Sequence, residues 1–187
     1  MLAAFPPGFF QQAAVDLAPA LIGATLTLEG VGGMIVETEA YDRDDPASHS
    51  FRGPTARNAA MFGPAGRAYV YRIYGMYWCL NVVCGELGHG AAVLIRALAP
   101  DVGIGEMQVR RGLTGLKGLA SGPGRLCQAL GVAREHDGIE LTDIPFALHP
   151  APAGLSILTG PRIGITKAVE RPWRFGLAGS PHLSRRF

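Results

Sequence analysis

The sequence has few cysteines and few lysines, and both shortages are informative. Its three cysteines, Cys79, Cys84 and Cys127, form no CxxC pair. Their spacing argues against a structural zinc site or an even disulfide framework, so we expect buried free thiols in a reducing cytoplasm. Two of the seventeen basic residues are lysine and fifteen are arginine. Arginine forms paired hydrogen bonds to phosphate, although a GC-rich coding bias would give the same excess.

The chain also lacks a long apolar run. No segment approaches the ~20 apolar residues of a membrane span, and the opening MLAAFPPGFF lacks the basic region that begins a signal peptide. The composition is 48% hydrophobic and 17% charged, as in compact globular proteins. We therefore expect one soluble, monomeric domain over residues 1–187, with no membrane partner. It would be cytoplasmic, associated with the nucleoid in a bacterium, or nuclear in a eukaryote.

Acidic residues are missing from one stretch of the chain. Residues 46–85 carry four arginines and no acid, whereas residues 1–45 carry seven acids and one base. Residues 144–187 carry six bases and one acid. Two basic segments in a chain of net charge +2 indicate a side that faces a polyanion.

Several catalytic motifs are absent as well. The sequence has no Walker motif, and GPAG and GIGEM do not fit the dinucleotide-binding fingerprint. It also lacks the HxE and PCxxC pair of zinc deaminases and the signatures of serine and cysteine hydrolases. The function must therefore come from another set of residues.

Turn formers divide the chain into short elements of both kinds. We predict a helix over 9–23, kinked or broken at Pro19, strands over 24–30 and 33–41, and a loop over 42–66 with a short helix at 57–62. Further strands are predicted over 68–84, broken at Tyr74-Gly75, and over 89–100, 161–166 and 173–179. A helix is predicted over 121–132, with Ser121 as cap and Pro123 in the first turn. The pattern is typical of one mixed α+β domain.

The segment IVETEAY carries an unusual strand face. Strand alternation places Glu37, Glu39 and Tyr41 on one side, successive members about 7 Å apart. A strand that buries Ile35 and Ala40 has no packing reason to carry two glutamates and a tyrosine opposite. We therefore expect this face to touch a ligand or a reacting group.

Tyrosine is scarce but concentrated. Four of the five tyrosines lie within residues 69–77 and the fifth is Tyr41, beside Glu39. Strand aromatics are most often core residues, which is an alternative for Tyr69 and Tyr77. In an acid-free arginine background, however, the cluster favours a pocket that sandwiches a nucleobase.

These segments together resemble a known family. The stretches IVETEAY, TARNAAMFGPAGRAYVYRIYGMYWCLNVV, AAVLIRAL, SGPGRLCQALG and RFGLAGSPHLS are similar to those of alkyladenine (3-methyladenine) DNA glycosylases, in order and spacing. The resemblance implies an α+β fold with a curved, largely antiparallel sheet and a protruding β-hairpin. It also implies monofunctional excision of alkylated or deaminated purines from double-stranded DNA, leaving an abasic site, with no cofactor and no metal.

The resemblance assigns roles to the pocket residues. Glu39 corresponds to the general base that positions the attacking water, with Glu37 as a structural or supporting acid. A carboxylate suits this role because it polarises water and stabilises an oxocarbenium-like sugar. Tyr41 and Tyr71 match residues that stack on the flipped purine, and His49 matches one that contacts the base opposite Tyr41.

Further residues are implied to contact DNA or to select the base. Tyr74, with Met76, matches the wedge that fills the gap left by the extruded nucleotide. Asn81 corresponds to the residue that guards against the amino group of guanine. Arg96 matches a phosphate contact, although pairing with an acid is the alternative. The resemblance also implies backbone contacts by Thr55 and Arg57.

Two other readings of the sequence stay open. A catalytically silent lesion-binding module would keep the aromatic pocket but would have no reason to keep a carboxylate at Glu39. Hydrolysis of free nucleosides would need the pocket but would have no use for a hairpin wedge. A DNA glycosylase accounts for both features.

Overall fold

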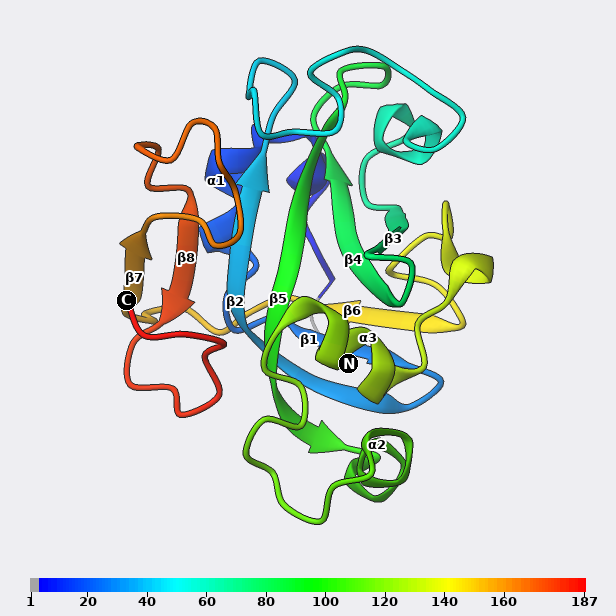
Figure 1. The fold of residues 1–187 in the computed structure, drawn as a ribbon, viewed down its shortest axis with the longest axis vertical. Helices are drawn as coiled ribbons and strands as arrows, with labels where there is room; N and C mark the ends of the chain where they lie inside the picture. The colour runs from blue at the N-terminus through cyan, green and yellow to red at the C-terminus, as the bar shows by residue number, and fades with distance from the viewer. Residues whose placement is uncertain (1–3) are drawn as a thin grey trace.

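A strongly curved antiparallel sheet forms the centre of the computed structural model, which describes residues 4–187 (Figure 1). Its strands follow the order β3-β4-β5-β2-β1-β6, and β8 pairs with both β2 and β7. The bounds are β1 Thr25–Leu28, β2 Val31–Tyr41, β3 Ala68–Ile73, β4 Tyr77–Cys84, β5 Ala91–Val102, β6 Phe146–His149, β7 Ile157–Gly160 and β8 Arg174–Leu177. The predicted mixed α+β class with a curved antiparallel sheet is confirmed.

The long strand β2 changes neighbours along its length. Its first residues pair with β1, and residues 37–39 pair with β8, while β5 runs along the other edge throughout. The β2–β5 register shifts three times, and such bulges bend a strand and re-aim its side chains. Gly32 and Gly33 allow the tight bend, because a Cβ at either position would lie 2.0 Å from a backbone oxygen of a neighbouring strand.

Residues 4–187 contain three α-helices, α1 Ala14–Ala20, α2 Ile104–Arg111 and α3 Pro123–Leu130. Short 3₁₀ turns occupy Phe9–Gln11, Ala59–Phe62 and Arg134–His136. α1 is joined to β2 by the Thr38 hydroxyl, which donates to Ala18 O at 2.8 Å. α3 buries Leu126, Cys127 and Leu130 against the sheet.

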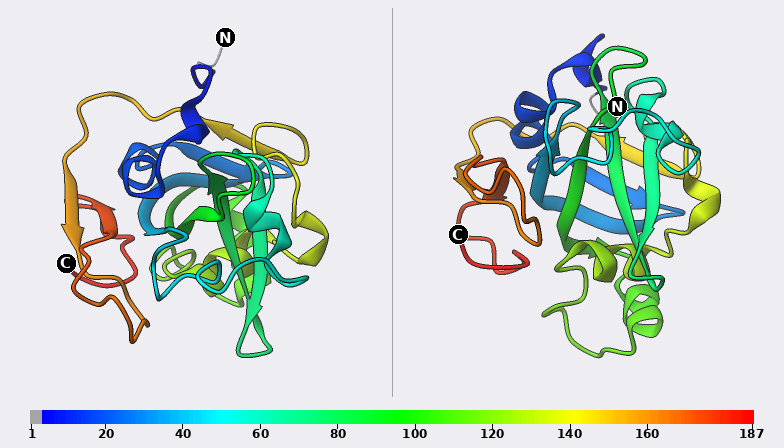
Figure 2. Two further views of the ribbon diagram at one scale, coloured as in Figure 1. Left: turned by 90° about the horizontal axis from the view of Figure 1, so that it is seen from above. Right: turned by 45° about the horizontal axis from the view of Figure 1, so that its top comes forward.

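The β3–β4 hairpin extends beyond the body of the molecule (Figure 2, left). Its turn falls at Tyr74-Gly75-Met76, as the sequence predicts. Gly124 of α3 lies against Tyr77, the first residue of β4 after the turn, and a Cβ on Gly124 would lie 3.0 Å from Tyr77 Cβ. The hairpin therefore stands on α3 as well as on the sheet.

Several predicted elements differ in detail. The first helix is shorter than predicted, with Pro19 inside its last turn. Residues 161–166 form no strand, because Arg162 and Ile163 are used for side-chain and backbone contacts with β2 instead. Ser121 does not cap α3: Gly122 holds the N-cap position at φ 114°, and the Ser121 hydroxyl donates to His182 O at 2.7 Å. Helix α2 and strands β6 and β7 have no counterpart among the predicted elements.

The three cysteines are buried and free, as expected. Within residues 4–187, no helix has the length and apolar character needed to cross a membrane. No group of three or more His, Cys, Asp or Glu side chains in that part of the chain is arranged to hold a metal ion.

Candidate active site

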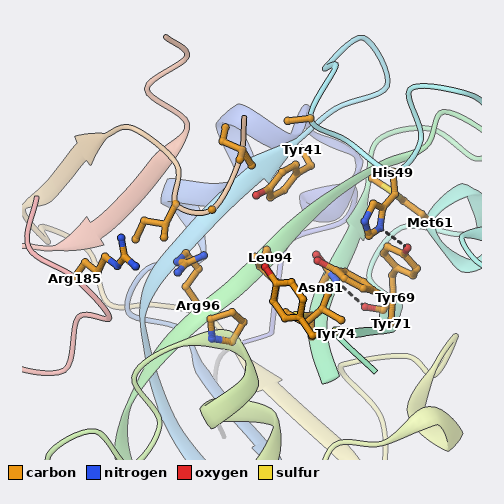
Figure 3. A pocket seen from close by; sticks show the side chains of 17 residues that line it. Tyr41, His49, Met61, Tyr69, Tyr71, Tyr74, Asn81, Leu94, Arg96 and Arg185 are labelled. Atoms are coloured by element: carbon orange, nitrogen blue, oxygen red, sulfur yellow. Dashed lines mark hydrogen bonds between the residues drawn. The ribbon is translucent and has the colours of Figure 1, made fainter. Parts of the chain in front are cut away.

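A cavity of about 420 Å³ opens between the end of β2, the β3–β4 hairpin and the loop at residues 161–165 (Figure 3). Its volume falls in the range of small-molecule sites, roughly 300–1,000 Å³. Its walls are aromatic, with Tyr41 on one side and His49, Tyr69 and Tyr71 on the other (Figure 3). The sequence-predicted residues Asn81, Tyr74 and Arg96 also line it.

The carboxylate of Glu39 lies fully buried behind this wall. Its Oε1 accepts a hydrogen bond from the Ile163 N–H at 2.7 Å, and its Oε2 accepts one from the Tyr41 hydroxyl at 2.8 Å. Arg96 NH1 lies 3.3 Å from Oε2. Because Tyr41, Arg96 and Ile163 all line the cavity, Glu39 is one side chain removed from whatever occupies it.

Opposing effects act on the ionisation of Glu39. Burial raises its pKa above the ordinary value, and the nearby charge of Glu37 acts in the same direction. The charge of Arg96, the Ile163 N–H and the Tyr41 hydroxyl all lower it. Burial is the largest effect, so the pKa of Glu39 is raised overall while three groups stabilise its charged form.

Tyr41 is held from behind by a buried arginine. The Arg162 guanidinium lies 4.7 Å from the centroid of the Tyr41 ring and 5.3 Å from that of Trp173. It donates to Ala40 O at 2.9 Å and forms a fork to the Asp45 carboxylate, with NH2 to Oδ1 at 3.0 Å. Burial and the adjacent Glu39 charge raise the pKa of Tyr41. Its hydroxyl therefore stays protonated and donates a hydrogen bond to Glu39.

The opposite wall is a stack of three rings. His49 Nδ1 and the Tyr69 hydroxyl are hydrogen-bonded at 2.9 Å, and the His49 ring meets Tyr71 edge to face at 4.5 Å. Part of the His49 ring is exposed to solvent. Burial of the rest against these rings, and the charge of Arg57, lower its pKa. The imidazole is therefore neutral at pH 7, with one donor and one acceptor.

Asn81 and Cys79 come from β4 and complete the wall beside Tyr69. Asn81 Nδ2 donates to Tyr69 O at 2.9 Å, which fixes the amide at the cavity surface. Burial raises the pKa of the Cys79 thiol to about 11, so it is protonated and unreactive at neutral pH. This part of the wall, formed by Cys79 and Asn81, is thus uncharged at neutral pH.

Arg96 is placed differently from the phosphate-contact prediction. Its side chain is 8% exposed, and its Nε and NH1 lie 3.3 Å from Glu37 and Glu39, respectively. A guanidinium held by two buried carboxylates has few donors left for DNA. The alternative, an arginine paired with an acid, describes the structure, and the phosphate role is withdrawn.

Glu37 is a buried structural acid, as expected. It receives Arg96, Arg174 at 3.2 Å, and both the backbone N–H and the hydroxyl of Ser184. All its oxygen acceptor sites therefore point into protein, away from the cavity. The predicted common face of Glu37, Glu39 and Tyr41 is confirmed, since Arg96 joins the two acids and Tyr41 reaches the second.

The hairpin tip presents three exposed apolar side chains. Tyr74 is 84% exposed, Met76 64% and Tyr77 47%. Tyr74 has φ 50°, in the left-handed region that non-glycine residues avoid. Tyr77 is therefore not a core residue, whereas Tyr69 is fully buried, as the alternative proposed for it.

Thr55 and Arg57 lie on the exposed loop that joins β2 to the hairpin. The Thr55 hydroxyl donates to Asn58 Oδ1 at 2.9 Å, and Arg57 NH2 donates to Arg72 O at 2.9 Å. Arg57 is therefore tied to the hairpin with part of its guanidinium facing solvent. The structure places Arg57 beside the hairpin, and neither residue lines the cavity.

Four residues around the site, three of them late in the chain, were not predicted from the sequence. Arg162 and Asp45 support Tyr41, Ile163 donates to Glu39, and Arg185 lines the cavity. A usable signal existed for Arg162, because an arginine within the apolar run RIGI would need a buried partner. The partner itself, 117 residues away in sequence, carries no such signal.

An aromatic cavity of this size, backed by a buried carboxylate and flanked by an exposed hairpin, is suited to one planar base taken out of a nucleic-acid stack. A family model described as methylpurine-DNA glycosylase (MPG) matches residues 8–181. The chain belongs to the methylpurine-DNA glycosylase family.

Similar proteins come from several bacteria and carry the provisional name 3-methyladenine DNA glycosylase. One from Nitrosospira multiformis is 60% identical over 95% of this chain and 92% of its own length. One from Rhodopseudomonas palustris (strain BisB18) is 58% identical over 96% of this chain and 90% of its own. One from Agrobacterium fabrum is 55% identical, over 97% and 93%. The likeness thus extends over nearly the whole chain.

Proposed function

We propose that the protein is a monofunctional glycosylase that removes damaged purines from double-stranded DNA. Its substrates would be 3-methyladenine, 7-methylguanine, hypoxanthine and ethenoadenine, and its product an abasic site in an uncut strand. The single observation that carries the proposal is the position of Glu39, a fully buried carboxylate behind an aromatic cavity and in contact with Arg96.

The flipped base would lie between Tyr41 and the wall of His49 and Tyr71. Base–aromatic stacking is worth about 1–3 kcal/mol per base, which offsets part of the few kcal/mol lost on leaving the duplex. Arg162 keeps Tyr41 in place for this contact, since the guanidinium covers the face of the ring that the base does not use. Asn81 is fixed where a base edge would meet it, consistent with selection against guanine.

In the proposed reaction the bond between the base nitrogen and the sugar C1′ breaks, and its electron pair leaves with the base. The oxygen of a water forms the new bond to C1′, and a proton of that water passes to Glu39. The water would take over the hydrogen bond that Glu39 Oε2 accepts here from Tyr41, or would bind between that oxygen and Arg96 NH1, which lies 3.3 Å away. The ionised carboxylate also stabilises the positive charge that develops on the sugar.

The exposed hairpin tip would enter the duplex during extrusion. Tyr74 and Met76 offer apolar side chains on a two-stranded support that is long enough to stand clear of the body (Figure 2, left). Arg57, beside the hairpin, and Thr55, on the same loop, would contact the DNA backbone. An apolar wedge of this kind has no use in hydrolysis of a free nucleoside.

The test is Glu39→Gln, assayed with duplexes that carry hypoxanthine or 7-methylguanine and are cleaved with alkali after incubation. The amide cannot accept a proton from water, so we expect lesion binding to persist while excision falls by at least about 100-fold. Glu37→Gln is the matched comparison, because Glu37 shares Arg96 but faces away from the cavity. It should lose much less activity. Near wild-type excision by Glu39→Gln would reject the proposed role.

A further inference from the structure

We propose that Ser184 is a positioning residue that aims Arg96 at Glu39, so that the segment 180–187 is part of the catalytic apparatus. This inference rests on the proposed function. It concerns a residue that touches neither the cavity nor the base, and it follows from how the acceptors around Arg96 are shared.

Each nitrogen of the Arg96 guanidinium has its own acceptor. Nε lies 3.3 Å from Glu37, NH2 donates to the Ser184 hydroxyl at 3.4 Å, and NH1 lies 3.3 Å from Glu39. A planar guanidinium is fixed in orientation when all its nitrogens are engaged. The first two contacts therefore determine where the third nitrogen points.

Ser184 also fixes the acid that holds Arg96. Its hydroxyl donates to Glu37 Oε1 at 2.9 Å, and its backbone N–H donates to Glu37 Oε2. One serine thus links both ends of the Glu37–Arg96 pair. Removing the hydroxyl leaves a buried guanidinium nitrogen and a carboxylate each one partner short, which favours reorientation of both.

The segment that carries Ser184 is itself anchored on β7 and β8. The ring of Phe187 lies 3.9 Å from the Arg174 guanidinium, and Arg174 NH2 donates to Arg186 O at 2.9 Å. Gly160 and Gly176 leave room for this ring, because a Cβ at Gly176 would lie 2.4 Å from it. Arg174 also pairs with Glu37, so the anchor and the site share one acid.

This arrangement predicts an effect on ionisation as well as on rate. The charge of Arg96 is the largest influence that lowers the pKa of Glu39 against the effect of burial. If Arg96 turns away, the pKa of Glu39 rises, and the ionised fraction at a given acidic pH falls. The ascending limb of the pH–rate profile must then move to higher pH.

The experiment compares Ser184→Ala with Ser184→Thr and Ser180→Ala by single-turnover excision of 7-methylguanine across pH, at saturating enzyme. Ser184→Ala should be about ten-fold slower at neutral pH, as for loss of one hydrogen bond to a charged group, and its ascending limb should lie at higher pH. Ser184→Thr keeps the hydroxyl and should restore both. Ser180→Ala is the matched control, since the Ser180 hydroxyl accepts a hydrogen bond from His182 N of its own turn at 3.3 Å and makes no side-chain contact to Arg96 or Glu37. It should behave as wild type.

A second readout does not depend on activity. The ¹³C carboxyl signal of Glu39, assigned by its absence in Glu39→Gln, should titrate at higher pH in Ser184→Ala than in the wild-type protein. An unchanged Glu39 titration, or a rate loss that Ser180→Ala reproduces without any pH shift, would overturn the positioning role. Absence of excision by the wild-type protein would overturn the proposed function instead, and the Glu39 titration would still decide the role of Ser184.

Discussion

Replacing Tyr74 tests whether its side chain acts on DNA or stabilises the fold. Tyr74 is 84% exposed and has φ 50°, so its ring adds little packing while its backbone is strained. The left-handed conformation costs a non-glycine residue about 1–2 kcal/mol. Tyr74→Gly should therefore raise the free energy of unfolding by about 1 kcal/mol, or the melting temperature by about 2–4 °C. Tyr74→Ala keeps the strain and should leave stability near that of the wild type.

Both replacements remove the ring that would fill the gap left by the flipped nucleotide. Stacking of one aromatic on a base is worth about 1–3 kcal/mol, which corresponds to a loss of about 5- to 150-fold. The loss applies where a stable stack must be opened. We therefore expect it in full on a paired hypoxanthine duplex, and much less of it on a single strand or a mismatch.

The assay is excision of hypoxanthine at subsaturating enzyme, from the duplex and from the single strand in parallel, with thermal unfolding of each variant. Tyr74→Phe is the control, since it keeps the ring and should retain duplex activity. A more stable Tyr74→Gly protein with impaired duplex excision would support the wedge. Equal losses on the two substrates would refute it and would leave Tyr74 as an ordinary surface residue.

The remaining predictions concern ionisation and burial. Burial raises the pKa of Glu39, and the proposed reaction requires its ionised form, so the excision rate should rise with pH at values above the ordinary glutamate pKa of 4.5. For 7-methylguanine the pH–rate profile should show this ascending limb alone. For hypoxanthine it should be bell-shaped, since a neutral base also needs a proton to leave. Asp45→Asn should leave Arg162 buried without its partner charge and destabilise the protein by about 3–5 kcal/mol in urea unfolding. Cys79, buried with a pKa of about 11, should resist iodoacetamide in the native protein and react once it is unfolded.

Local chemistry explains which parts of the fold the sequence predicted. The hairpin turn was predicted because Tyr74-Gly75 lies between two β-rich runs, and the turn conformation is decided within a few residues. Helix α3 was predicted from Ser121 as cap and Pro123 in the first turn, but the cap was assigned wrongly, since Gly122 holds that position. The hydroxyl of Ser121 contacts His182, a choice made by tertiary structure that no local pattern reveals.

Long-range contacts explain what the sequence did not predict. The loop at 161–165 reads as a short strand because its apolar residues alternate, yet it supplies Ile163 N to Glu39 and Arg162 to Asp45. These contacts join positions more than a hundred residues apart. In the sequence, the only sign of these contacts is Arg162 within an apolar run. It indicates a buried arginine but does not identify Asp45 as its partner.

The error over Arg96 has the same origin and shows how the site is built. In the β2–β5 pairing, Glu39 lies opposite Leu94 and Glu37 opposite Ala97, with register shifts around Glu37. Those shifts bring Arg96 between the two acids, and their positions cannot be predicted by counting residues along either strand. Two buried carboxylates this close would repel each other, and a cation between them lowers that cost. The charge of Arg96 thus favours the ionised form of Glu39 against the effect of burial, as the proposed role of Glu39 as a proton acceptor requires.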